Sequence, residues 1–181
     1  MERGFLVRPR SGEVIRSVAH RMLDALDMKG RQVPVMHVLE GVLPYVDDRF
    51  SFEILEPEEM LQRFRMNAEG MTVHRDNTIA LRIDVYVAAC SGAGRHRFTA
   101  AHELGHYLLH KDEGMQFPRK STPETKIYCD SEWQANTFAR EFLVDLRYCG
   151  RLSGPEEVAS FYQVSTQVAE IQWNAAKKMA P

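Results

Sequence analysis

Residues 97–110 read RFTAAHELGHYLLH, and within them His102 and His106 stand four residues apart, with Glu103 directly after the first histidine. On an α-helix this spacing places two side chains on one face, so that both imidazoles can reach a single ion. Three leucines give the same segment an apolar side: Leu104, Leu108 and Leu109. The stretch therefore predicts an amphipathic helix that carries a pair of metal ligands.

The carboxylate of Glu103 gives this pair a chemical use. A zinc ion held by protein ligands lowers the pKa of its bound water to about 7. A neighbouring carboxylate can take the proton from that water as it attacks a peptide carbonyl. The motif thus favours metal-dependent peptide hydrolysis, with Glu103 as the catalytic base.

A catalytic zinc site needs a third protein ligand beside the two histidines, because it normally has three and leaves one position for water. His110 lies two helical turns from His102, about 12 Å along the axis, so one ion cannot bind both. It is more typical of a polar residue near a helix C-terminus. Asp112 would require the chain to reverse sharply after the helix, and Leu109 occupies the position where a glycine would permit that reversal.

Glu132 is the better third ligand because it begins a second helical pattern, SEWQANTFAREFLVDL at residues 131–146. Glu132 shares one stripe of that helix with Ala135 and Ala139, and small side chains allow two helices to approach closely. Its alternative interpretation is a glutamate favoured at a helix N-terminus by the helix dipole. We predict that His102, His106 and Glu132 are the metal ligands.

The rest of the chain alternates between two hydrophobic periods. Further helical patterns occupy residues 11–28, 34–43 and 56–64. The first has Ser11 as its predicted N-cap and an apolar stripe of Val14, Ile15, Val18, Met22, Leu23 and Leu26. Alternating patterns at residues 50–54 and 78–85, with a strand and turn between residues 69 and 79, predict a small sheet. The expected fold class is α+β.

The C-terminal stretch from Gly154 predicts two helices joined near Val164 and Ser165, an outline similar to a helix-turn-helix. Its lysines gather only at Lys177 and Lys178, so direct nucleic-acid binding is not favoured. A helical hairpin packed on the core, or a surface that docks substrate, are the other interpretations. We expect a single domain over residues 1–181, with N-terminal helices in 1–50, the sheet and metal site in 51–150, and this hairpin in 151–181.

Composition restricts the location and partners of the chain. The 23 basic and 25 acidic residues give a formal net charge of -2, without the positive field typical of non-specific nucleic-acid binding. The first residues lack the apolar core of a secretion signal, and no apolar run approaches the ~18 residues that span a bilayer. The three cysteines form no C-x-x-C pair. We expect a soluble cytoplasmic protein with reduced thiols.

Two extended motifs together resemble the ImmA/IrrE family of zinc metallopeptidases: RFTAAHELGHYLLH at residues 97–110 and EWQANTFAREFLV at residues 132–144. DVYVAACSGAGRHRF at residues 84–98 is also similar to the segment before the metal helix in phage-associated members. The resemblance implies a compact gluzincin-like α+β fold. It implies ligand roles for His102, His106 and Glu132, and a catalytic role for Glu103. Residues 142–145 depart from the LLMP-like sequence frequent in the family.

The resemblance also implies a function, since characterised relatives cleave transcriptional repressors that have a helix-turn-helix domain. We expect a zinc-dependent endopeptidase that cuts such a repressor through Glu-assisted attack of zinc-bound water. A toxin-like or host-directed protease of a mobile element, and a non-catalytic zinc-binding regulator, are the alternatives. Manganese or iron could also occupy such a site. The sequence does not choose an oxyanion donor among Tyr86, Tyr107 and Tyr128.

Overall fold

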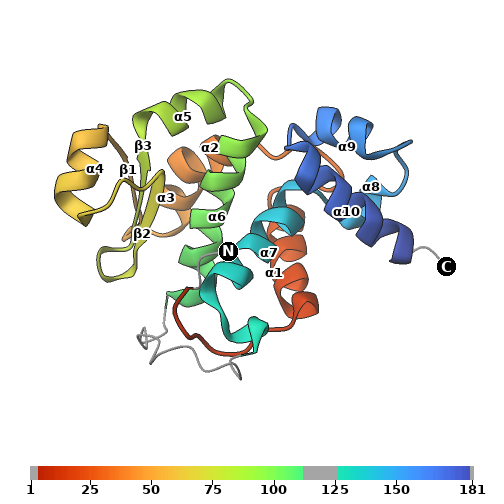
Figure 1. Ribbon diagram of the computed structural model, residues 1–181, viewed down its shortest axis with the longest axis horizontal. Helices are drawn as coiled ribbons and strands as arrows, with labels where there is room; N and C mark the ends of the chain where they lie inside the picture. The colour runs from red at the N-terminus through yellow and green to blue at the C-terminus, as the bar shows by residue number, and fades with distance from the viewer. Residues whose placement is uncertain (1–3, 112–125, 180–181) are drawn as a thin grey trace.

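The computed structural model describes residues 4–111 and 126–179. It has the predicted α+β fold, in which helices surround a small three-stranded sheet. Figure 1 shows α6 between this sheet on one side and the helices α7 and α1 on the other. Within the described ranges, no helix combines the length and apolar composition needed to cross a membrane.

The sheet consists of β1 (Ser51–Leu55), β2 (Gly70–Val73) and β3 (Thr78–Arg82), in the order β1-β3-β2. The central strand β3 pairs parallel with β1 and antiparallel with β2. Its residues from Thr78 to Leu81 are buried, which accounts for the apolar pattern of this segment. The edge strand β2 lies against α6. Helix α4 (Pro57–Phe64) starts with a capping box formed by Glu56 and Glu59 and connects β1 to β2.

Three helices pack beside one another next to the sheet: α1 (Gly12–Ala25), α6 (Gly94–His110) and α7 (Ser131–Leu143). Helix α7 packs between α6 and α1. Gly105 makes the closest approach possible, because a Cβ atom there would lie 3.1 Å from the carbonyl oxygen of Ala135. Ala135 and Ala139 are completely buried. The small residues therefore allow the close helix contact that the sequence predicted.

Helix α1 begins as expected, since the Ser11 hydroxyl accepts a hydrogen bond from the Val14 backbone N–H at 3.3 Å. Its buried face is formed by Ile15, Ala19 and Leu23, with Val18, Met22 and Leu26 partly buried. Val14 is 51% exposed, contrary to its predicted place in the apolar stripe.

The second predicted helix does not end near Leu43. Helical structure runs through α2 (Val35–His37), the π-helical turn η1 (Val38–Val42) and α3 (Leu43–Val46). Proline lacks an N–H donor and clashes with the preceding turn of an α-helix. The wider π-turn lies immediately before Pro44, where it accommodates the ring without ending the helix.

Two predicted boundaries also change. The strand expected over residues 78–85 ends at Arg82, and residues from Ile83 begin helix α5 (Ile83–Cys90). The helix expected over residues 131–146 stops at Leu143. Asp145 then caps a separate short helix, α8 (Leu146–Cys149). The alternation of polar and apolar residues continues through Asp84 and Val85, which explains the first error.

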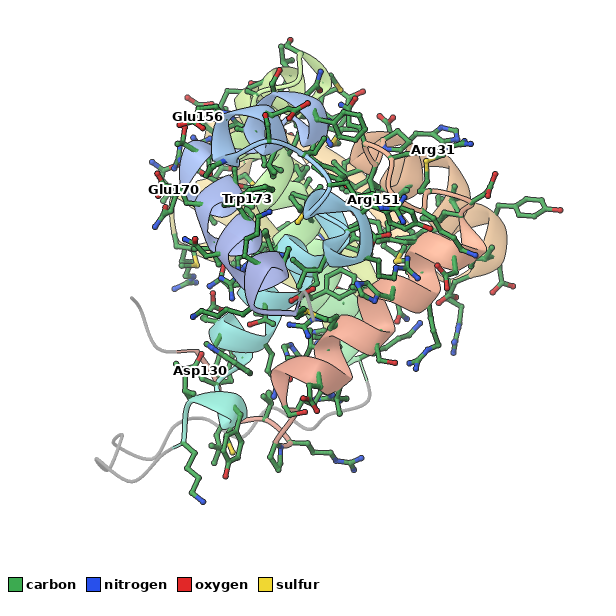
Figure 2. The ribbon with its side chains drawn as sticks, turned by 90° about the vertical axis from the view of Figure 1, so that its right-hand side faces the viewer. Arg31, Asp130, Arg151, Glu156, Glu170 and Trp173 are labelled. Atoms are coloured by element: carbon green, nitrogen blue, oxygen red, sulfur yellow. The ribbon has the colours of Figure 1, made fainter. Side chains whose placement is uncertain are left out.

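The C-terminal stretch forms α9 (Pro155–Tyr162) and α10 (Thr166–Met179), with Ser165 accepting a hydrogen bond from the Val168 N–H. One side of the pair packs inward through Val158, Tyr162, Val168, Ala169, Gln172 and Ala176. Figure 2 turns these helices toward the viewer, with the exposed Glu156 and Glu170 labelled at their margin. Helix α10 packs against α9, α8 and α7.

Candidate metal centre

The described structure brings the three predicted ligands together. The Nε2 atoms of His102 and His106 lie 3.0 Å apart on one face of α6. Across from them, the Glu132 carboxylate places Oε2 3.2 Å from His102 Nε2 and Oε1 3.1 Å from His106 Nε2. Among the described residues, this is the one cluster of three histidine, cysteine or acidic side chains whose ligand atoms lie within 4.8 Å of one another.

The spacing of these atoms fits a metal ion. Zinc binds nitrogen and oxygen at about 2.0–2.1 Å, so tetrahedral coordination separates its ligand atoms by about 3.3 Å. The separations of 3.0, 3.2 and 3.1 Å among the two imidazoles and the carboxylate are close to that value. Two nitrogens and one carboxylate are also the donor set of many catalytic zinc sites.

The electrostatics of the cluster favour a positive charge at its centre. Burial lowers the pKa of His102, but its hydrogen bond to Glu132 and the nearby charge of Glu103 outweigh burial and raise that pKa overall. Burial raises the pKa of Glu132, but hydrogen bonds from His102 and His106 outweigh it and hold that pKa well below its usual range. The carboxylate is therefore ionised, and a proton or a metal ion supplies the charge that balances it.

Family comparison agrees with this geometry. The model of the IrrE N-terminal-like domain, Peptidase_M78, matches residues 59–174. This range covers more than half of the 181 residues and includes the complete cluster. The chain belongs to the Peptidase_M78 family. The resemblance to ImmA/IrrE peptidases is thereby confirmed, and no curated protein matches the chain.

Membership in Peptidase_M78 supports a metallopeptidase-type function, and a family of proteases implies a protein substrate. The cluster of His102, His106 and Glu132 is consistent with that function. The matched range begins within α4, so α1 and the segment before it lie outside the region that the family model covers. Contacts from that segment to the cluster therefore lie outside what the family model describes.

Glu103, in this Peptidase_M78 chain, lies between the cluster and the edge strand β2. Glu103 is only 7% exposed. The Thr72 hydroxyl lies 2.7 Å from Glu103 Oε2 and 2.9 Å from the Glu103 carbonyl oxygen. A hydroxyl has one hydrogen to donate, so it holds either the carboxylate or the backbone of Glu103 at any moment. No sequence pattern indicated Thr72, because only the sheet brings it beside α6.

The far sides of both histidines are also paired. His102 Nδ1 lies 3.0 Å from Asn136 Oδ1, and His106 Nδ1 lies 3.2 Å from His110 Nδ1. Asn136 follows Glu132 by one helical turn, a spacing from which sequence analysis could have found it. His110 is the last residue of α6, in agreement with its predicted place near the helix C-terminus, but it is only 2% exposed and stands behind His106. Burial, together with the charge of His106, lowers the pKa of His110 to about 3.

The N-terminal segment around Gly4 and Phe5 supports the start of α7, a role that no sequence pattern indicated. The Phe5 N–H donates to Ser131 Oγ at 2.9 Å, and the Phe5 carbonyl accepts from the Ser131 N–H at 3.0 Å. A Cβ atom at Gly4 would lie 2.8 Å from the backbone nitrogen of Glu132. The segment therefore packs directly against the residue that carries the third ligand.

Asp130 joins this segment to the helix. One oxygen of its carboxylate caps α7 by accepting from the Trp133 N–H at 2.9 Å, and the other accepts from the Gly4 N–H at 3.2 Å. Figure 2 labels Asp130 at the beginning of α7. The cap and the N-terminal segment together hold the first turn of α7, in which Glu132 lies.

Two of the three candidate tyrosines make hydrogen bonds elsewhere. The Tyr86 hydroxyl donates to Glu40 at 2.7 Å, and the Tyr107 hydroxyl donates to Asp47 at 2.9 Å. Tyr128 lies in the turn η3 (Ile127–Cys129), shortly before α7. The rival ligand Asp112 lies outside the described residues.

Proposed function

We propose that this chain is a zinc-dependent endopeptidase, in which His102, His106 and Glu132 hold the metal and Glu103 is the general base. The observation that carries the proposal is the convergence of two imidazole nitrogens and one carboxylate beside a second, buried carboxylate. Two nitrogen ligands and one oxygen ligand favour zinc among the common divalent metals. Three protein ligands leave a coordination position for solvent, unlike a closed structural site.

Catalysis then divides among the chain's own residues. Zinc, when bound, polarises a water molecule and lowers its pKa toward neutrality. Glu103 accepts the proton of the attacking water and delivers it to the leaving amine. The Thr72 hydroxyl, when it donates to Glu103 Oε2, fixes the orientation of the carboxylate and leaves Oε1 able to accept that proton. Burial of Glu103 restricts competing solvent around the proton transfer.

We propose a helix-turn-helix transcriptional repressor as the substrate, as the resemblance to ImmA/IrrE peptidases implies. A cytoplasmic location would place the enzyme beside such a substrate. We also treat residues 1–181 as one metallopeptidase domain. The packing of α1 on α7 and the contact of Gly4 with Glu132 support this view, because they join the N-terminal region to the metal centre.

The test is incubation of the zinc-loaded full chain with the repressor encoded beside it, followed by mass spectrometry of the products. Glu103→Gln is the matched control, since the amide cannot accept the proton although the metal ligands remain. We expect cleavage of one defined bond by the unchanged chain, and a rate about 100- to 10,000-fold lower for Glu103→Gln. Equal cleavage by both proteins would remove Glu103 from the mechanism.

The substrate proposal has a separate outcome. If the repressor stays intact while other cellular proteins are cut, the host-directed alternative replaces it. If no protein is cut although zinc binds with three protein ligands, the chain is a non-catalytic zinc-binding regulator. Elemental analysis of the purified protein identifies the bound metal in either case.

A further inference from the structure

A chain of buried polar side chains extends from His106 away from the metal centre. His106 Nδ1 faces His110 Nδ1 at 3.2 Å, and His110 Nε2 faces Gln134 Oε1 at 3.2 Å. Gln134 is completely buried and His110 almost so. Because buried polar groups are hydrogen-bonded, each contact along this chain has one donor and one acceptor. Their order can therefore be worked out from one fixed end.

The fixed end is the side-chain amide of Gln134. Its Nε2 lies 2.8 Å from the carbonyl oxygen of Arg8 and 2.8 Å from that of Tyr128. Carbonyl oxygens can only accept, so the group facing them must be the NH2. The amide oxygen then faces His110 and the guanidinium of Arg10, whose Nη1 lies 3.2 Å away. The flipped amide would place acceptors against acceptors and donors against the arginine.

The protons of both histidines follow from this orientation. Because Gln134 Oε1 accepts, His110 Nε2 carries the hydrogen and the neutral ring has a lone pair on Nδ1. His106 must then donate from Nδ1. Its Nε2 donates to Glu132 when the ring is protonated, and it has a lone pair when the ring is neutral. That atom faces His102 Nε2 and the Glu132 carboxylate. Only this tautomer of His106 can bind a metal through Nε2.

We propose that His110 and Gln134 are positioning residues that fix His106 in its Nδ1–H tautomer and aim its Nε2 at the metal, thereby raising the affinity of the site. The inference rests on the proposed metal site but does not depend on hydrolysis. Hydrogen bonds to the far nitrogen of a ligating histidine fix its ring and raise its basicity. On the far side of His102, the corresponding nitrogen Nδ1 contacts one side chain, that of Asn136.

The chain of contacts also reaches the N-terminal segment, since Gln134 is held by the Arg8 carbonyl and by Arg10. A buried histidine could serve packing alone, and the two roles make different predictions. Packing affects the stability of the fold. Positioning affects the tautomer of His106 and the affinity for the metal.

Gln134→Leu and Gln172→Leu form a matched pair for this test. Each glutamine is buried, and each amide donates to two backbone carbonyls, for Gln172 those of Arg140 and Val144. Only Gln134 contacts a histidine of the chain described above. Zinc affinity of the full chain is measured by competition with a chelator, beside urea denaturation of each metal-free protein. His110→Phe is the third variant, because it keeps the ring but removes both nitrogens.

We expect Gln134→Leu and His110→Phe to weaken zinc binding about 10- to 100-fold, while Gln172→Leu leaves it unchanged. Equal zinc affinities in the two Gln→Leu variants would overturn the proposal. The unchanged protein supplies an independent readout, because ¹⁵N NMR of its imidazoles distinguishes the tautomers. A His106 ring with its hydrogen on Nε2 and none on Nδ1 would also overturn it, even if a variant fails to fold. A protein that binds zinc in this way but cuts nothing would contradict only the proposed hydrolysis.

Discussion

Helices α6 and α7 both contribute to the metal centre, but they do so by different means. α6 supplies two imidazoles through the spacing of His102 and His106, which any α-helix would bring together. α7 supplies one carboxylate. The position of that carboxylate depends on hydrogen bonds from Gly4 to Asp130 and from Phe5 to Ser131, each across 126 positions of the chain. Local helix geometry therefore brings the two histidines together, whereas tertiary contacts bring the carboxylate to them. Changes in the two helices should therefore have different consequences.

Loss of a ligand should have the largest effect and tests whether both helices contribute. We expect His106→Ala and Glu132→Ala each to weaken zinc binding more than about 100-fold, since removing a ligand exceeds the effect of removing its supporting contacts. Isothermal titration or chelator competition measures this. Glu170→Ala, an exposed glutamate on α10, is the control. Unchanged affinity in Glu132→Ala would exclude α7 from the site and leave the two histidines alone.

A substitution between the two helices should disturb them together. In Gly105→Val the added atoms meet Ala135 and the Phe138 ring, each 3.1 Å from the position of a Cβ atom. We expect the free energy of unfolding to fall by about 1–3 kcal/mol through overpacking, measured by urea denaturation. Gly12→Val is the control, because no atom lies within 4 Å of a Cβ there. Equal stabilities of the two variants would mean that the helices do not need this close approach.

A change in the N-terminal segment should affect α7 and spare α6. In Gly4→Val a Cβ atom would lie 2.2 Å from Ser131 Oγ and 2.8 Å from the Glu132 nitrogen, so the segment and the helix must separate. We expect zinc affinity to fall about 10-fold, as for other contacts that support a ligand. Chelator competition with Gly12→Val as reference measures this. An unchanged affinity would show that α7 places Glu132 without help from residues 4–10.

The smallest effect is expected at the far end of α6, where Asp47 accepts hydrogen bonds from Lys111 and Tyr107. The hydrogen bond from Lys111 is the larger cause, and together with the bond from Tyr107 it holds the pKa of Asp47 well below its usual 3.8. A lowered folded-state pKa gives stability that is present above 3.8 and lost as the pH falls toward the folded value. Because the pair is partly exposed, the gain is small.

Asp47→Asn should therefore lower the thermal midpoint slightly at neutral pH and lose that difference as the pH falls below 3.8. Melting curves at a series of pH values measure it, with the exposed neighbour Asp48→Asn as control. Metal binding should not change in either variant. The same pH profile in both variants would show that the hydrogen bonds of Asp47 add nothing to stability.

The sequence by itself determined the elements whose signals are local. The four-residue spacing in α6, the Ser11 cap of α1 and the capping box of α4 all depend on residues within a few positions of one another. The alternating pattern likewise located the strands. Local patterns failed at Pro44, where a π-turn continues the helix, and at Ile83, where a helix follows a strand without a break.

Tertiary structure alone decided which groups surround the metal ligands. Thr72 reaches Glu103 because β2 is the sheet edge beside α6, and no spacing in the sequence relates them. His110 lies at the C-terminus of α6 as predicted, but its contact with Gln134 of α7 makes it a buried partner of His106. Hydrogen bonds act over about 3 Å in space without regard to distance along the chain. The ligand types could therefore be predicted from the sequence, whereas their supporting contacts required the packed helices.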